Sequence, residues 1–167
     1  MSARDELPPQ AAGAGATPAP VVVRVQRLPH GAGLPLPAYE TDGAAGMDLR
    51  AAVLEAVTLE PGAIVSVPTG LAIEVPPGFE VQLRPRSGLA ARHGVTLANS
   101  PATIDSDYRG ELLVALIHHG HTPLAIERGM RIAQMVLARV PRIAWEPVES
   151  LAPTSRGAGG FGHTGIA

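Results

Sequence analysis

Two carboxylates, a hydroxyl and an aromatic ring crowd together in the stretch Thr103-Ile104-Asp105-Ser106-Asp107-Tyr108-Arg109-Gly110. An unbroken apolar run of strand length, Leu112 to Ile117, follows at once. We therefore expect the polar cluster at the rim of a buried sheet, where small and rigidly held sites are commonly built. The same two Asp residues also suit a plain capped turn, because an Asp side chain bonds nearby backbone amides.

A second cluster, Arg84-Pro85-Arg86-Ser87-Gly88, places two guanidinium groups beside a hydroxyl at the predicted start of a helical turn. Free backbone amides at that position favour an anion, so the cluster predicts a phosphate cradle. A capped helix with solvated arginines would give the same pattern. Gln134 interrupts an apolar strand and must find hydrogen-bond partners there, either in the neighbouring backbone or in a ligand.

Metal chemistry is limited by the ligands that the chain offers. A hard cation such as Mg²⁺ is usually held by substrate phosphates plus one or two carboxylates, for which Asp48 and Asp105 are candidates. His118, His119 and His121 predict no transition-metal site, because strand alternation sends neighbouring side chains to opposite faces. No acidic or Cys ligand stands near them in sequence.

The elements that must position these groups are short β-type runs separated by turn signals such as Pro68-Thr69-Gly70. Only Ser87 to His93 predicts a short helix, with Ser87 as N-cap and Gly94 as terminator. The chain is therefore predicted to be all-β, a sandwich or barrel. The expected strands cover residues 21–27, 47–53, 64–67, 71–75, 79–83, 94–98, 112–117, 124–126, 132–138 and 143–145.

Several expected strands, most plainly Leu112 to Ile117, are apolar on both faces. A sandwich of this size buries only one face of most strands, so another subunit could cover the second face. A homo-oligomer is therefore expected, although a two-layer core inside one chain would explain part of the pattern.

The 167 residues suffice for one domain with a core, and the formal charge of −2 gives no argument for binding nucleic acid. All 13 basic residues are Arg, which excludes a lysine Schiff base and a Walker-type phosphate loop. The absence of Cys excludes disulfides and thiolate chemistry, and it fits a reducing compartment such as the cytoplasm. No apolar stretch at the N-terminus is long enough for a signal sequence or a membrane span.

The two ends differ in composition from the middle. Residues 1–20, rich in Ala, Gly and Pro, predict a disordered leader before a β domain at 21–149. Residues 150–167 are Gly-rich and predict a flexible arm or a frayed end. Within them, the ring of Phe161, the cation of Arg156 and the hydroxyl of Thr164 would suit a base and a terminal phosphate.

Five segments in order resemble the motifs of the trimeric dUTPase family. The resemblance spans residues 39–164, and the order of the motifs makes it far more specific than any single one. The five segments are Ala45-Gly46-Met47-Asp48-Leu49, Pro85-Arg86-Ser87-Gly88-Leu89, Asn99 through Gly110, Gly129 through Met135, and Arg156 through Gly165.

The resemblance implies a homotrimer of jelly-roll (β-clip) subunits that hydrolyses dUTP to dUMP and pyrophosphate with Mg²⁺. Such an activity keeps uracil out of DNA and supplies dUMP for thymidylate synthesis. Asp105 matches the carboxylate that deprotonates the water attacking the α-phosphorus, and Tyr108 matches the ring against C2′ of the deoxyribose. Asp48 matches a carboxylate linked to the water shell of the metal. The other implied contacts are Arg86, Ser87, Gly88 and Gln134 for the phosphates, Asn99, Thr103, Ile104 and Leu113 for uracil, and Arg156, Gly160, Phe161, His163 and Thr164 in the arm.

Two positions depart from the family pattern: Ala102 stands where Gly is frequent, and Arg109 occupies a variable position. In the family, Asn99, Thr103, Ile104 and Leu113 correspond to a hairpin that reads uracil, and Ala102 is expected to restrict slightly the approach of this hairpin to the base. Two alternatives remain open, namely a dCTP deaminase of the same fold and a non-catalytic trimeric β protein that binds nucleotides. Ser87-Gly88-Leu89 and the Gly-Phe-Gly arm resemble the diphosphatase more closely. No membrane or nucleic-acid partner is expected.

Overall fold

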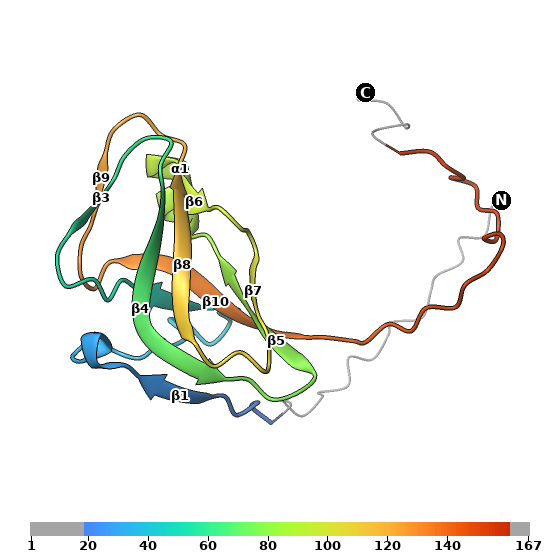
Figure 1. Cartoon of the computed structure of the whole chain (residues 1–167), viewed down its shortest axis with the longest axis horizontal. Helices are drawn as coiled ribbons and strands as arrows, with labels where there is room; N and C mark the ends of the chain where they lie inside the picture. Colours follow the sequence, from blue (N-terminus) through green and yellow to red (C-terminus); the bar gives the residue numbers. More distant parts are fainter. Residues whose placement is uncertain (1–18, 161–167) are drawn as a thin grey trace, which may run out of the picture.

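The computed structural model describes residues 19–160, which form two four-stranded antiparallel sheets and one two-stranded sheet (Figure 1). The first sheet has the order β1-β4-β8-β6 and the second β2-β10-β5-β7, while β3 pairs with β9. The first-sheet strands are β1 (Arg24–Arg27), β4 (Ile64–Glu74), β8 (Glu111–His118) and β6 (Val95–Leu97). The others are β2 (Met47–Arg50), β10 (Arg131–Arg139), β5 (Phe79–Arg84), β7 (Ala102–Ile104), β3 (Val57–Leu59) and β9 (Leu124–Ile126).

Two short helices complete the described chain, the 3-10 turn η1 (Pro29–Gly31) and α1 (Ser87–His93). The prediction of an all-β, jelly-roll-like chain with one short helix at 87–93 is confirmed. Gly94 ends α1 in the left-handed conformation, as predicted, with φ of 67°. The predicted N-cap was wrong, because Ser87 is the first helical residue and Arg86 stands at the N-cap. Among residues 19–160, no helix is long and apolar enough to cross a membrane.

Side chains from both large sheets form one hydrophobic core, and β8 shows how strand alternation builds it. Leu112, Val114 and Leu116 are fully buried, whereas Leu113 between them is 48% exposed. The neighbouring strand β4 places Ile64 opposite Ile117 on the same outer face, and Ile64 is also exposed. Residues 19–160 therefore do not cover the second apolar face of β8. This favours the explanation that another subunit covers it over the explanation of a two-layer core within one chain.

Strand β4 contradicts the predicted turn at Pro68-Thr69-Gly70, because it runs without interruption from Ile64 to Glu74. A register shift between Pro68 and Ala72 absorbs the proline as a β-bulge. Gly70 has φ of +68° and lies so close to Gly31 that a Cβ at either position would collide with the other backbone. The glycine therefore permits a close approach of η1 and marks no turn.

Three further strand predictions were wrong. The short strands β3 and β7 were not predicted, and β7 ends inside the polar cluster, at Ile104. Residues 143–145 join no sheet in the described structure, and Ile143 and Trp145 are strongly exposed. The segment that follows β10 instead runs away from the sheets, as Figure 1 shows in red.

Candidate active site

Asp48, Arg86 and Gln134 come from distant parts of the sequence and meet where β2 and β10 lie beside the segment that links β5 to α1. Gln134 on β10 lies opposite Asp48 on β2 and opposite Arg84 on β5, so the three strands bring their side chains to one face. The Arg86 Nε atom donates to Asp48 Oδ1 at 3.0 Å, and Gln134 Nε2 donates to the Pro85 carbonyl at 3.0 Å. The side chains of Asp48 and Arg86 are 18% and 26% exposed, so the ion pair is largely shielded from solvent.

Arg131 belongs to the same cluster, although sequence reasoning did not select it. Its Nη1 lies 3.1 Å from Asp48 Oδ2, and its carbonyl accepts a hydrogen bond from Arg86 Nη1 at 3.2 Å. Plain alternation would put Arg131 and Gln134 on opposite faces of the strand. A register shift between Arg131 and Ala133 removes that expectation, and no sequence signal announces this bulge.

These contacts define the cationic cluster: Asp48, Arg86, Arg131 and Gln134. Two guanidinium groups share the Asp48 carboxylate, and the exposed Glu40 carboxylate lies 3.9 Å from Arg131 Nη1. Guanidinium donors grouped in this way suit a phosphate chain. Gly46 explains part of its motif, because a Cβ there would lie 2.9 Å from Gln134 Oε1. Ser87 and Gly88 follow Arg86 in the first turn of α1, where backbone N–H groups have no acceptor within the helix.

The carboxylate and the ring of the first polar cluster lie at a different place, in the loop between β7 and β8. Thr103 and Ile104 pair with β5, which holds the hairpin against the second sheet. The exposed Asp105 follows β7 directly, and its carbonyl accepts a hydrogen bond from the Tyr108 N–H at 3.2 Å. The Tyr108 hydroxyl donates to the Glu111 carbonyl at 2.9 Å. The loop is thus anchored at both ends.

Gly110 and Ala102 lie next to this loop and differ in how they pack. Gly110 lies against the Tyr108 ring, and any Cβ there would collide with it. Ala102 is buried in the core opposite Leu83, so its methyl group points away from the exposed Thr103. The expected restriction of the hairpin by Ala102 therefore finds no support in the packing.

The two groups lie at opposite ends of β5 within one chain. Asp105 lines a polar hollow with Phe79 and Glu80 at the start of the strand, whereas Arg86 follows its end. Six strand residues span roughly 20 Å at the usual rise of a β-strand. One chain therefore does not bring Asp105 and the cationic cluster within reach of the same phosphate.

The residues predicted in the arm are described only in part. Arg156 is exposed and its Nε donates to the Gly159 carbonyl at 2.8 Å, which closes a local turn. Gly160 is the last described residue, and Phe161, His163 and Thr164 lie outside the described residues. Asn99, at the other end of the proposed uracil hairpin, is exposed before β7.

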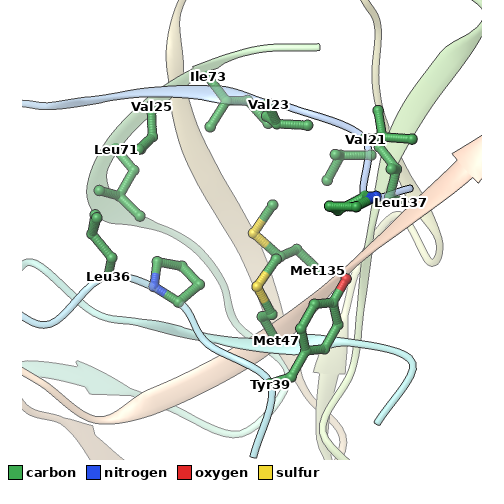
Figure 2. Close-up of a pocket in the computed structure, with 13 residues that line it drawn as sticks. Val21, Val23, Val25, Leu36, Tyr39, Met47, Leu71, Ile73, Met135 and Leu137 are labelled. Atoms are coloured by element: carbon green, nitrogen blue, oxygen red, sulfur yellow. The ribbon is translucent and has the colours of Figure 1, made fainter. Parts of the chain in front are cut away.

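An apolar cavity of about 340 Å³ lies apart from both groups, between the N-terminal segment and the second sheet. Figure 2 shows Met47 and Met135 beside Tyr39, with Val23 and Leu137 among the other aliphatic side chains around them. Its lining carries no charged side chain, so it offers nothing to a triphosphate.

His118, one of the three histidines considered as metal ligands, has a structural role. His118 is buried, and its Nδ1 accepts from the Gly120 N–H at 2.9 Å. Its Nε2 therefore donates to the Thr122 carbonyl at 2.8 Å. Both ring nitrogens are used for structure, and residues 19–160 hold no group of three potential metal ligands.

Comparison with known proteins identifies the family. The dUTPase family model matches residues 33–165. The dUTPase of Staphylococcus bacteriophage 80alpha with dUpNHpp shares 24% identity, with a TM-score of 0.77 over 87% of this chain and 99% of that chain. A mutant dUTPase of phage phi11 of S. aureus, whose structure reveals the coordination of a structural Mg(II) ion, shares 20% identity, with a TM-score of 0.70 over 79% and 99% of the two chains. The chain belongs to the dUTPase family.

Proposed function

We propose that this chain hydrolyses dUTP to dUMP and pyrophosphate by attack of a water molecule on the α-phosphorus, in a site shared between subunits of a homotrimer. The family match supports the reaction. The observation that most supports a shared site is the distance along β5 between two groups. The exposed loop with Asp105 lies at one end of the strand and the cationic cluster at the other. Two half-sites of complementary chemistry on one chain suit a symmetric assembly in which one copy supplies each half.

In the proposed mechanism Asp105 is the general base for the attacking water. Its carboxylate is exposed, so it can orient a water molecule and accept a proton from it. Tyr108 stacks its ring against C2′ of the deoxyribose and leaves no room for a ribose hydroxyl. Asn99, with the backbone of Thr103 and Ile104 and the exposed Leu113, reads uracil.

The cationic cluster stabilises negative charge on the triphosphate. Arg86 and Gln134, with the first-turn amides of Ser87 and Gly88, supply donors to phosphate oxygens, and Arg131 adds charge beside them. Preorganised donors of this kind act where charge develops in the transition state. We add Arg131 to the implied set because it shares the Asp48 carboxylate with Arg86.

Magnesium fits this cluster only as a hydrated ion. Both oxygens of Asp48 already accept contacts from guanidinium groups, so direct coordination would break two ion pairs. A water shell around the ion would meet the same carboxylate at lower cost, which matches the preference of Mg²⁺ to keep its waters. When bound, the ion would neutralise charge on the phosphate oxygens.

The arm is proposed as a lid. Phe161 would stack on uracil, while Arg156, Gly160, His163 and Thr164 would close over the γ-phosphate. Ordering a Gly-rich segment costs entropy that contacts with the triphosphate offset, and closure excludes water from the reaction. A chain without cysteine fits the reducing cytoplasm as the place of this reaction.

A substrate panel tests the proposal. The protein is incubated with dUTP, UTP, dTTP and dCTP, with and without Mg²⁺, and pyrophosphate and ammonia are assayed separately. We expect far more pyrophosphate from dUTP than from the other three nucleotides, and a strong increase with Mg²⁺. Ammonia from dCTP would instead identify the deaminase, which the family match does not favour, and no turnover of any nucleotide would leave a binding protein.

A further inference from the structure

Arg109 folds its side chain back over the loop that carries Asp105 and Tyr108. Its Nη1 donates to the Ser106 carbonyl at 2.7 Å and to the Tyr108 carbonyl at 2.8 Å. Both carbonyls accept from one charged nitrogen, and such charge-assisted bonds are stronger than neutral ones. One guanidinium group therefore fixes the peptide planes on both sides of Asp107 and Tyr108.

The other hydrogen bonds described for Tyr108 hold its ring tip and its N–H, and Arg109 alone holds the peptide that follows it. Its N–H donates to the Asp105 carbonyl at 3.2 Å, which is a long bond, and its hydroxyl donates to the Glu111 carbonyl at 2.9 Å. These bonds hold the tip of the ring and the start of the loop. The peptide between Tyr108 and Arg109, from which the ring is aimed, is held by the Arg109 bond.

The second guanidinium nitrogen of Arg109 points to the end of β4. Its Nη2 lies 3.8 Å from Glu74 Oε1, and Glu74 also accepts two bonds from Arg24 Nη1 at 3.1 and 3.2 Å. Arg109 is 53% exposed, and exposed ion pairs add little to the free energy of unfolding. The contacts of Arg109 therefore act on the direction of the loop more than on the stability of the fold.

We propose that Arg109 is a positioning residue that aims Tyr108, and through it Asp105, and so sets the discrimination between deoxyribose and ribose. This inference rests on the proposed function, in which the Tyr108 ring packs against C2′. A Tyr108 ring that is free to tilt leaves space for the 2′-hydroxyl. It also displaces Asp105, the proposed general base, whose backbone carbonyl accepts a hydrogen bond from the Tyr108 N–H.

The test compares Arg109→Met, which keeps the stem and removes the donors, with Arg24→Met as control. Arg24 contacts the same Glu74 carboxylate and makes no contact with the loop among its described hydrogen bonds. For Arg109→Met we expect kcat for dUTP to fall about 10-fold and the dUTP-to-UTP ratio of kcat/KM to fall about 5-fold. Its Tm should change by less than about 2 °C, as expected for an exposed position.

Arg24→Met is expected to match the wild type within about twofold in both quantities. Arg109→Lys, whose ammonium can also donate to two carbonyls, is expected to recover most of the ratio. An Arg109→Met variant that loses activity with an unchanged ratio would overturn the inference, as would an Arg24→Met variant with the same defect. A wild-type protein that does not hydrolyse dUTP refutes the proposed function itself, whereas an active wild type with a fully selective Arg109→Met variant overturns only the role of Arg109.

Discussion

Asp105 and Asp107 stand two residues apart in one exposed loop and line the same polar hollow, yet we propose different roles for them. Asp105 follows β7 directly, and its backbone carbonyl is bonded to the Tyr108 N–H. Asp107 also lines an open groove between Pro77 and Arg109, away from the β7 end. At the scale of single residues, the choice of general base therefore depends on whether a bound nucleotide lies next to Asp105 or Asp107.

We predict that Asp105→Asn lowers kcat for dUTP by at least about 100-fold with little change in KM. The amide keeps the shape of the side chain but cannot accept the proton of water, and general-base catalysis commonly contributes this much. Asp107→Asn is the matched control and should retain activity within about threefold. Steady-state pyrophosphate release measures both variants, and equal losses in the two would contradict the assignment.

At the scale of elements, we propose that the segment after β10 serves activity and contributes little to folding. The backbone hydrogen bonds described for residues 154–159 are local, such as Gly157 N–H to the Thr154 carbonyl at 3.1 Å, and nearly all residues of this segment are exposed. The core ends with β10 at Arg139. A lid built from such a segment adds closure to the site without adding to the core.

We predict that a chain ending at Ser155 keeps its assembly and its Tm within about 2 °C, because the described residues 156–160 do not belong to the core. Its kcat/KM for dUTP should fall by at least about 100-fold, since closure no longer excludes water. Deletion of residues 1–18, which lie outside the family match, provides the control and should leave activity intact. A large drop in thermal stability of the shortened chain would show that the arm belongs to the fold.

Elements also show how far the sequence could be interpreted. Alternation and turn chemistry predicted β8 and the Gly94 stop of α1, because both depend on neighbours in sequence. The sequence did not predict that β4 is continuous, because Gly70 looks like a turn residue. In the structure Gly70 lies next to a β-bulge, and it is required because Gly31 packs directly against it. Local signals do not report such long-range contacts.

Some residues of the candidate site could likewise be predicted from the sequence, and others could not. The residues that match family motifs could be selected from the sequence. The structure brings Asp48 and Gln134 to adjacent strands, and Arg86 reaches Asp48 from the start of α1. Arg131 could not be selected, because its side chain reaches Asp48 only through the bulge in β10. The distance of Asp105 from that cluster depends on the register of β7 against β5, which no spacing in the sequence encodes.

At the scale of the whole molecule, the separated half-sites and the uncovered apolar face of β4 and β8 have one common explanation. The exposed Ile64 and Leu113, with the half-buried Ile117 beside them, form an apolar surface that a globular chain normally covers. A threefold assembly would bury that surface and would also bring the loop of one copy to the cationic cluster of another. In that case the chain can hydrolyse dUTP only when it is assembled.

This explanation predicts that two inactive variants restore each other. Asp105→Asn and Arg86→Met, each inactive alone, are co-expressed with different tags, and doubly tagged trimers are isolated. If a site takes Asp105 from one copy and Arg86 from the next, each mixed trimer has one intact site, and pyrophosphate release should approach about a third of the wild-type rate. Sites contained within one chain would give mixed trimers no more active than either variant, because every chain then lacks one of the two groups.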